Sequence, residues 1–118
     1  MSTTESLRAE RVGDVVELVP GGTLRGGGET DELQGELLGL IGRRERKILL
    51  NLEHATFVTS RGFGVLFGAQ IEANEHGITL YVCNIPPRVQ QVLESLKCLQ
   101  VLNHFDDRDE ALRALKKL

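Results

Sequence analysis

The sequence predicts an α/β domain in which a mostly parallel central sheet of about five strands, with an N-terminal hairpin, is covered by about four helices. Three observations support this fold class. Short apolar runs of strand-forming residues alternate with stretches of helical periodicity, glycine and proline mark the boundaries, and 118 residues fit one domain spanning 1–118. Strands that alternate with helices pair mostly in parallel, because each helix carries the chain back across the sheet.

The N-terminal part reads as a hairpin followed by a loop. Residues Ser6–Val19 contain two short strands that meet near Gly13-Asp14, a dipeptide typical of tight turns. The next ten residues, Pro20–Glu29, include five glycines. So much glycine favours a flexible loop over a regular element.

The first helix is predicted to begin at Thr30, whose hydroxyl can cap the free N–H groups at its start. Apolar residues then recur at helical spacing from Leu33 to Ile41. Four basic residues crowd the far end of this helix, where the dipole favours cations: Arg43, Arg44, Arg46 and Lys47. A solvated helix end is favoured for this cluster over a docking patch.

The remaining elements continue the alternation of strand and helix. They are a buried strand at Ile48–Leu52, a helix from Ser60 or Arg61 to Glu75 that Gly77 ends, a strand at Ile78–Cys83, a helix entered through Pro86 and Pro87 with Val89, Val92, Leu93 and Leu96 on one face, a short strand at Leu99–Leu102, and a last helix that begins at Asp106 or Asp107 and carries Ala111, Leu112 and Leu115.

Composition excludes several classes of function. The net charge is −3 and the chain has no Trp, one Tyr and four Phe, so neither a basic surface nor stacking platforms favour direct binding of nucleic acid. Cys83 and Cys98 are too few and too far apart for a disulfide framework, and no cluster of residues has the spacing of metal ligands, so no cofactor is expected. The first residues lack the apolar core of a signal peptide and no apolar run could span a bilayer, which predicts a cytoplasmic protein without membrane contact.

The segment HATFVTSRGFGVLFGAQ, residues 54–70, places two adjacent hydroxyls at the mouth of a helix. A nucleophilic serine at position 60 would need a glycine at position 58, which is Val. It would also need a histidine within reach, and the three histidines, His54, His76 and His104, are scattered along the sequence. A phosphate-binding loop would need a Gly-Lys-Ser/Thr ending, which is absent. Two interpretations stay open: Ser60 is a simple helix cap, or it is a serine that a kinase phosphorylates, with Gly62 and Gly64 giving the kinase access to the backbone.

The same helix has two apolar faces. One consists of Val65, Leu66, Ala69 and Ala73 and can cover the sheet. The other, called here the aromatic stripe, consists of Phe63, Phe67 and Ile71 at intervals of four residues. The stripe is either a docking surface beside Ser60 or a face buried against a neighbouring helix.

The segment ILLNLEHATFVTSRGFGVLFGAQ resembles the core of the STAS domain, and in particular of the bacterial anti-sigma factor antagonists. Members of that family have an apolar strand, a loop that ends in Asp-Ser-Ser/Thr-Gly, and an aliphatic helix. The likeness continues through HGITLYVCNIPPRVQQVLESLKCLQVLNHF and FDDRDEALRAL, so it covers nearly the whole chain. It implies a STAS-like single domain.

The resemblance also implies a function. In the relatives, the serine after the Asp is phosphorylated by a partner that is both a serine kinase and an anti-sigma factor; the unmodified antagonist binds this partner, the phosphorylated one releases it, and a serine phosphatase resets the cycle. This role falls on Ser60 here, with Thr59 as a less favoured acceptor. Thr59, Arg61, Gly62, Phe63 and Phe67 would form the surface for the partner, and the chain would be no enzyme.

Two residues depart from the family pattern: Thr59 replaces the Asp and Arg61 replaces the second hydroxyl. These departures keep other functions in view. They are a STAS scaffold or interaction module that is not regulated at Ser60, with other STAS proteins as partners, and a STAS domain that binds a nucleotide or a lipid.

Overall fold

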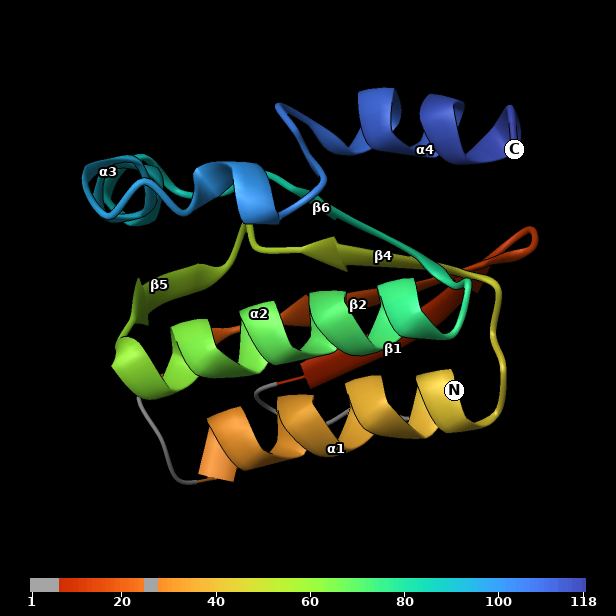
Figure 1. The fold of residues 1–118 in the computed structure, drawn as a ribbon, viewed down its shortest axis with the longest axis horizontal. Coiled ribbons are helices and arrows are strands. Elements are labelled where there is room, and N and C mark those ends of the chain that lie inside the picture. The colour runs from red at the N-terminus through yellow and green to blue at the C-terminus, as the bar shows by residue number, and fades with distance from the viewer. Residues whose placement is uncertain (1–6, 25–27) are drawn as a thin grey trace.

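The computed structural model describes residues 7–24 and 28–118. Its main sheet has the strand order β1-β2-β4-β6-β7, and a second, two-stranded sheet pairs β3 with β5 (Figure 1). The strands are β1 (Leu7–Val12), β2 (Val15–Pro20), β3 (Gly22–Leu24), β4 (Lys47–Asn51), β5 (Ala55–Val58), β6 (Thr79–Cys83) and β7 (His104–Phe105), and the helices are α1 (Gly28–Gly42), α2 (Ser60–Glu75), α3 (Pro87–Ser95) and α4 (Arg108–Lys116).

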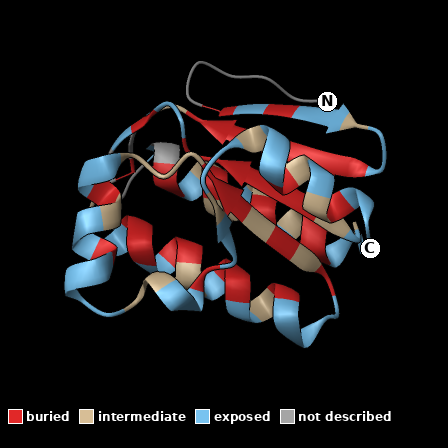
Figure 2. Cartoon of the chain, turned by 90° about the horizontal axis from the view of Figure 1, so that it is seen from above, coloured by how far each residue is buried: buried red, intermediate tan, exposed pale blue. Residues whose placement is uncertain are grey.

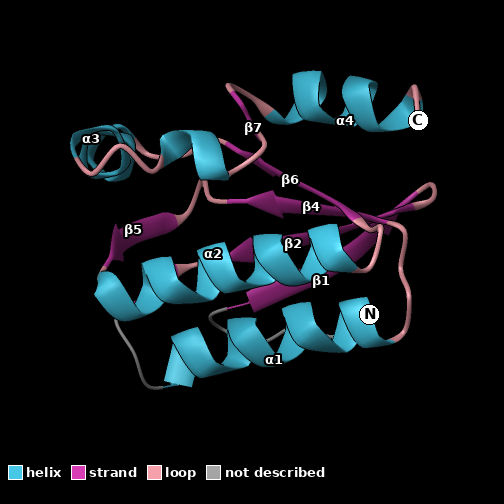
Figure 3. Ribbon diagram, viewed as in Figure 1, coloured by secondary structure: helices cyan, strands magenta, loops and turns pink. Residues whose placement is uncertain are grey.

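The predicted fold class is confirmed. β1 and β2 form the antiparallel N-terminal hairpin around Gly13, whose φ of 63° suits glycine, and every other pairing in the main sheet is parallel. Figure 3 shows the helices lying on either side of the sheet. None of the described helices is long and apolar enough to cross a bilayer.

Side chains along each strand point alternately to the two faces of the sheet, so each face has its own core under its own helices. Ile48 and Leu50 of β4 belong to the larger core, which α1 and α2 cover, whereas Leu49 packs with Ala111 and Leu115 of α4 on the opposite face. Figure 2 shows the buried strands between helices whose outer faces are exposed. The helices α1 and α2 therefore lie together on one face, and this layer carries the candidate site.

The structure corrects the prediction for Pro20–Glu29. Residues Gly22–Leu24 form β3, which pairs in parallel with β5, and the helix α1 already begins at Gly28; residues 25–27 lie outside the described part of the chain. Thr30 is therefore a buried residue inside α1 rather than its cap. The residues of β3 do not predict a strand by themselves, because a strand of only three residues is stabilised by its pairing with β5. The prediction did not include β5 either.

Three further predictions change near the helix ends. Residues Leu99–Val101 form a short 3₁₀ helix rather than a strand, because the N–H groups of Val101 and Leu102 bond back to carbonyls three residues earlier. The last strand is β7. Val92 of α3 and Leu96, which directly follows that helix, are 44% and 58% exposed, so only Val89 and Leu93 of the predicted face are buried. The basic cluster follows α1 instead of ending it, since the helix stops at Gly42.

A buried carboxylate ties α4 to the sheet. The side chain of Glu17, which is 3% exposed, accepts hydrogen bonds from Nε of Arg108 at 3.0 and 2.9 Å and from Nδ2 of Asn51 at 3.1 Å. A buried charge is tolerated only when it is paired and hydrogen-bonded in this way. Beside it, burial and then the charge of Glu17 raise the pKa of the Cys83 thiol to about 12.

Candidate functional site

The two hydroxyls of the central motif lie where β5 ends and α2 begins. Thr59 takes the capping position with an extended backbone (φ −97°, ψ 179°), and Ser60 is the first residue of the helix. The Ser60 side chain is exposed. Ser60 is therefore not the cap itself, and its hydroxyl stands in solvent beside the first N–H groups of α2, which have no carbonyl partner within the helix.

A buried carbonyl on β3 holds this junction in place. The carbonyl oxygen of Leu24 accepts hydrogen bonds from the backbone N–H of Thr59 at 3.0 Å and from its hydroxyl at 3.3 Å. The Thr59 hydroxyl therefore serves the fold and does not cap α2. A carboxylate at position 59 could not donate this side-chain hydrogen bond, which gives the threonine a local structural reason.

Gly62 is required by the same carbonyl. A Cβ at position 62 would lie 2.3 Å from the Leu24 oxygen and 2.8 Å from Cγ1 of Val58. The glycine therefore lets α2 approach β3 of its own chain, rather than leaving space for a partner. Gly64 differs, because a Cβ there would meet nothing within 4 Å.

Arg61 reaches across to α1. Its Nη2 lies 2.9 Å from Oδ1 of Asp31 and 3.3 Å from Oε1 of Gln34. Arg61 and Asp31 are 46% and 62% exposed, so solvent screens the pair and its net contribution to stability is at most about 1 kcal/mol. What the pair does set is position: the cation beside Ser60 is turned toward the first turns of α1.

The aromatic stripe passes from buried to exposed along α2. Phe63 is 8% exposed and belongs to the core, Phe67 is half-buried, and Ile71 is 52% exposed. The rings of Phe63 and Phe67 stack with centroids 6.3 Å apart. The end of the stripe beside Ser60 is therefore buried, whereas Ile71 and part of Phe67 remain open to solvent, and the docking role of the stripe stays a prediction.

The geometry does not bring a general base to Ser60 from either histidine of the flanking elements. His54 precedes β5, which spans about 13 Å, and His76 follows α2, which is about 24 Å long. In the described part of the chain no three His, Cys, Asp or Glu side chains gather as metal ligands would. What the arrangement offers is an exposed hydroxyl at the positive end of a helix, next to a cation, where a phosphate is electrostatically favoured.

Sequence reasoning found Ser60 and its neighbours but missed the residues that position them. Leu24 holds the start of α2, and Asp31 and Gln34 orient Arg61. No local pattern marks Leu24, which follows a glycine pair in the predicted loop.

Comparisons with known proteins agree with this fold. An anti-sigma F factor antagonist of Paenibacillus polymyxa is 27% identical over 88 residues, which are 74% of this chain and 75% of the relative. A solved anti-sigma-factor antagonist (STAS) domain protein of Planctomyces limnophilus superposes with a TM-score of 0.80 at 19% identity, covering 94% of this chain and 98% of that one.

The anti-sigma factor antagonist SpoIIAA, from Bacillus, is similar in both of its solved forms. The unphosphorylated form superposes with a TM-score of 0.76 at 19% identity, covering 96% of this chain and all of that one, and the phosphorylated form with 0.73 at 18%, covering 95% and 98%. The profile of the STAS domain matches residues 7–111, nearly the full length. This chain therefore belongs to the STAS domain family.

Proposed function

We propose that this protein is a cytoplasmic, non-enzymatic anti-sigma factor antagonist in a partner-switching pathway. Unmodified, it binds an anti-sigma factor that is also a serine kinase; phosphorylated on Ser60, it releases this partner until a serine phosphatase restores it. The observation that carries the proposal is the exposed Ser60 hydroxyl at the first position of α2. This is the position that the family resemblance assigns to the regulated serine, and named antagonists among the relatives support the role.

Electrostatics explain how the modification would act at the interface rather than on the fold. A phosphate brings a charge of about −1.5 to −2. At the first turn of α2 the helix dipole favours that charge, and Arg61 can exchange Asp31 for the phosphate, so the free domain tolerates it. In a desolvated contact with a partner the same charge costs several kcal/mol unless the partner pairs it. The complex dissociates while the domain stays folded.

The neighbouring residues divide into contacts and supports. Ser60 and Arg61 are exposed and Thr59 and Phe67 half-buried, so these four would meet the partner. Gly62 and Phe63 are buried and would act from beneath, by holding α2 against β3 and the core. Thr59 is a poor acceptor of phosphate, because its hydroxyl is bonded to the Leu24 carbonyl.

A second candidate is a STAS interaction module that works without phosphorylation, assembling with other STAS proteins. One observation favours it: the carboxylate that the family places before the acceptor serine is replaced by Thr59, which is used internally. The two candidates share a surface and differ in whether charge at Ser60 controls it.

The deciding experiment compares wild-type protein with Ser60→Asp and Ser60→Ala as baits in extract from the native cell. Wild type and Ser60→Ala should capture a protein identified by mass spectrometry as an anti-sigma factor with a kinase domain, and Ser60→Asp should not. Ser95→Asp is the matched control, because it adds the same charge at another exposed serine. Equal capture by Ser60→Asp and Ser95→Asp would reject the switch in favour of the unregulated module.

The stability of Ser60→Asp shows whether a loss of capture comes from the added charge or from misfolding. Ser60→Asp should be as stable as wild type or more stable by about 0.3–1 kcal/mol, because a carboxylate in the first turn complements the dipole. Chemical denaturation measures this. A Ser60→Asp protein that loses both capture and stability would show that the variant misfolds and would contradict the electrostatic account.

A further inference from the structure

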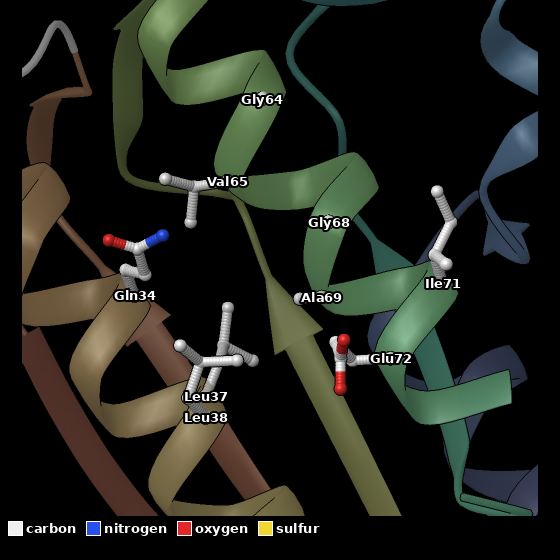
Figure 4. Close-up of a pocket in the computed structure, with 9 residues that line it drawn as sticks. All are labelled: Gln34, Leu37, Leu38, Gly64, Val65, Gly68, Ala69, Ile71 and Glu72. Atoms are coloured by element: carbon white, nitrogen blue, oxygen red, sulfur yellow. The ribbon is translucent and has the colours of Figure 1, made fainter. Parts of the chain in front are cut away.

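An apolar groove of about 490 Å³ lies between α1 and α2, one turn beyond Ser60. Figure 4 shows Leu37 and Leu38 of α1 facing Val65 and Glu72 of α2 across it. Leu38 is 45% exposed at one edge. Solvent-exposed apolar side chains that line a hollow indicate a surface built for contact rather than a scattered exposed residue.

Missing side chains on α2 keep the groove open. Gly64 and Gly68 line it, and a Cβ at either position would meet nothing within 4 Å. Glycine inside a helix is about 1 kcal/mol less favourable than alanine. Because neither glycine is needed for packing within the chain, unlike Gly62, the helix bears this cost without an internal reason.

The groove lies in the most acidic layer of the molecule. The sequences of α1 and α2 contain six of the chain's 17 acidic residues but one of its 14 basic residues, Arg61. That arginine is itself paired with Asp31, and the carboxylate of Glu72 lines the groove. An occupant should therefore be apolar toward the groove and cationic at its flanks.

We propose that this groove receives an amphipathic helix of a partner protein, with apolar anchors on one face and lysine or arginine beside them. The lining runs along α2 from Gly64 to Glu72, about 12 Å. That length accommodates anchors at positions i, i+4 and i+7 of one helix, which is how amphipathic helices occupy grooves. A second copy of this chain that docks through its own α1–α2 layer fits less well, since that layer has the same negative charge.

This site goes beyond the proposed regulation of Ser60 and does not depend on it. Its test uses a synthetic helical peptide with leucines at i, i+4 and i+7 and lysines between them, labelled for fluorescence anisotropy. The control peptides are a scrambled one of the same composition, which has no apolar face, and one with glutamate in place of lysine. Wild type and Ser60→Ala should bind the first peptide alike, and the controls at least about tenfold more weakly.

Two pairs of variants locate the binding. Gly68→Leu fills the groove, whereas Gly35→Leu adds the same side chain at another open helical glycine that does not line it. Gly68→Leu should lower affinity about tenfold and Gly35→Leu less than twofold. Glu72→Lys should weaken binding more than Glu75→Lys, which lies outside the groove.

Melting curves check that the variants are folded, and amide chemical shifts should move at Gly64 and Gly68 when the peptide is added. Equal effects of the two leucine variants would mean that the peptide does not bind in the groove. Equal binding of the lysine peptide and the scrambled peptide would mean that charge alone holds the peptide. Either result would overturn the proposal. A dimer seen in sedimentation that Gly68→Leu abolishes would overturn it in favour of a second copy. Binding of a small apolar dye that Gly68→Leu blocks, without any binding of peptide, would replace the helix with a small molecule.

Discussion

Gly62→Ala tests the contact that positions the candidate site. The new Cβ would stand 2.3 Å from a backbone oxygen, and real Cβ atoms essentially never come within 3.0 Å of another atom, so α2 or β3 must move by about 0.7 Å. The oxygen belongs to Leu24 and cannot turn away, because Thr59 donates two hydrogen bonds to it. Overpacking of this kind costs about 1–3 kcal/mol.

The gain in helix propensity from alanine offsets part of this cost, by up to about 1 kcal/mol. We therefore expect Gly62→Ala to lower the free energy of unfolding by about 1–2 kcal/mol. Gly64→Ala is the matched control two residues on, where a Cβ meets nothing, and it should raise the free energy by about 0.5–1 kcal/mol. The two variants should differ by about 2 kcal/mol, or about 8 °C in melting temperature.

Urea denaturation of both variants with far-UV circular dichroism measures the difference. The partner assay adds a second readout, since moving the start of α2 displaces Thr59 and Ser60, whereas Gly64→Ala leaves them in place. A Gly62→Ala protein as stable as Gly64→Ala would refute the reasoning, because it would mean that β3 and α2 are not in close contact at Leu24.

Three further predictions concern the core. Phe63→Ala should cost about 3–5 kcal/mol in urea denaturation, against less than about 1 kcal/mol for the exposed Ile71→Ala; equal losses would mean that Phe63 is not core. Arg108→Ala leaves the Glu17 carboxylate buried with one fewer partner and should lower the free energy of unfolding by about 2–3 kcal/mol. This is less than the loss usual for a fully buried pair, because the Arg108 side chain is 40% exposed. Adding Glu17→Gln should recover part of the loss in a double-mutant cycle. Burial raises the pKa of the Cys83 thiol from 9.0 to about 12, so the thiol of the unfolded chain ionises first as pH rises and unfolding releases a proton. The free energy of unfolding should therefore fall between pH 9 and 12, by up to about 1.4 kcal/mol per pH unit more in wild type than in Cys83→Ala. Parallel pH curves for the two proteins would contradict the raised pKa.

The sequence by itself determined most helices and strands, because the patterns that mark them lie within a few consecutive residues. Helical spacing marked α2, whose Val65, Leu66, Ala69 and Ala73 are all buried, and the apolar run at Ile48–Leu52 matched β4 within a residue. Asp107 caps α4 through its side chain, which accepts from the N–H of Glu110, as a capping residue should. Periodicity and caps act within one turn or one strand, so a single sequence contains them.

Only the tertiary structure decided how the candidate site is held and where its surface lies. β3 is a strand because β5 offers it hydrogen bonds from more than 30 residues away, a pairing that the glycines around it conceal. The same long-range packing buries Phe63, leaves Ile71 in solvent, and turns Arg61 toward Asp31. A sequence shows which residues are apolar or charged, but the neighbours that bury, pair or expose them come from segments far along the chain, and those neighbours exist only once it has folded.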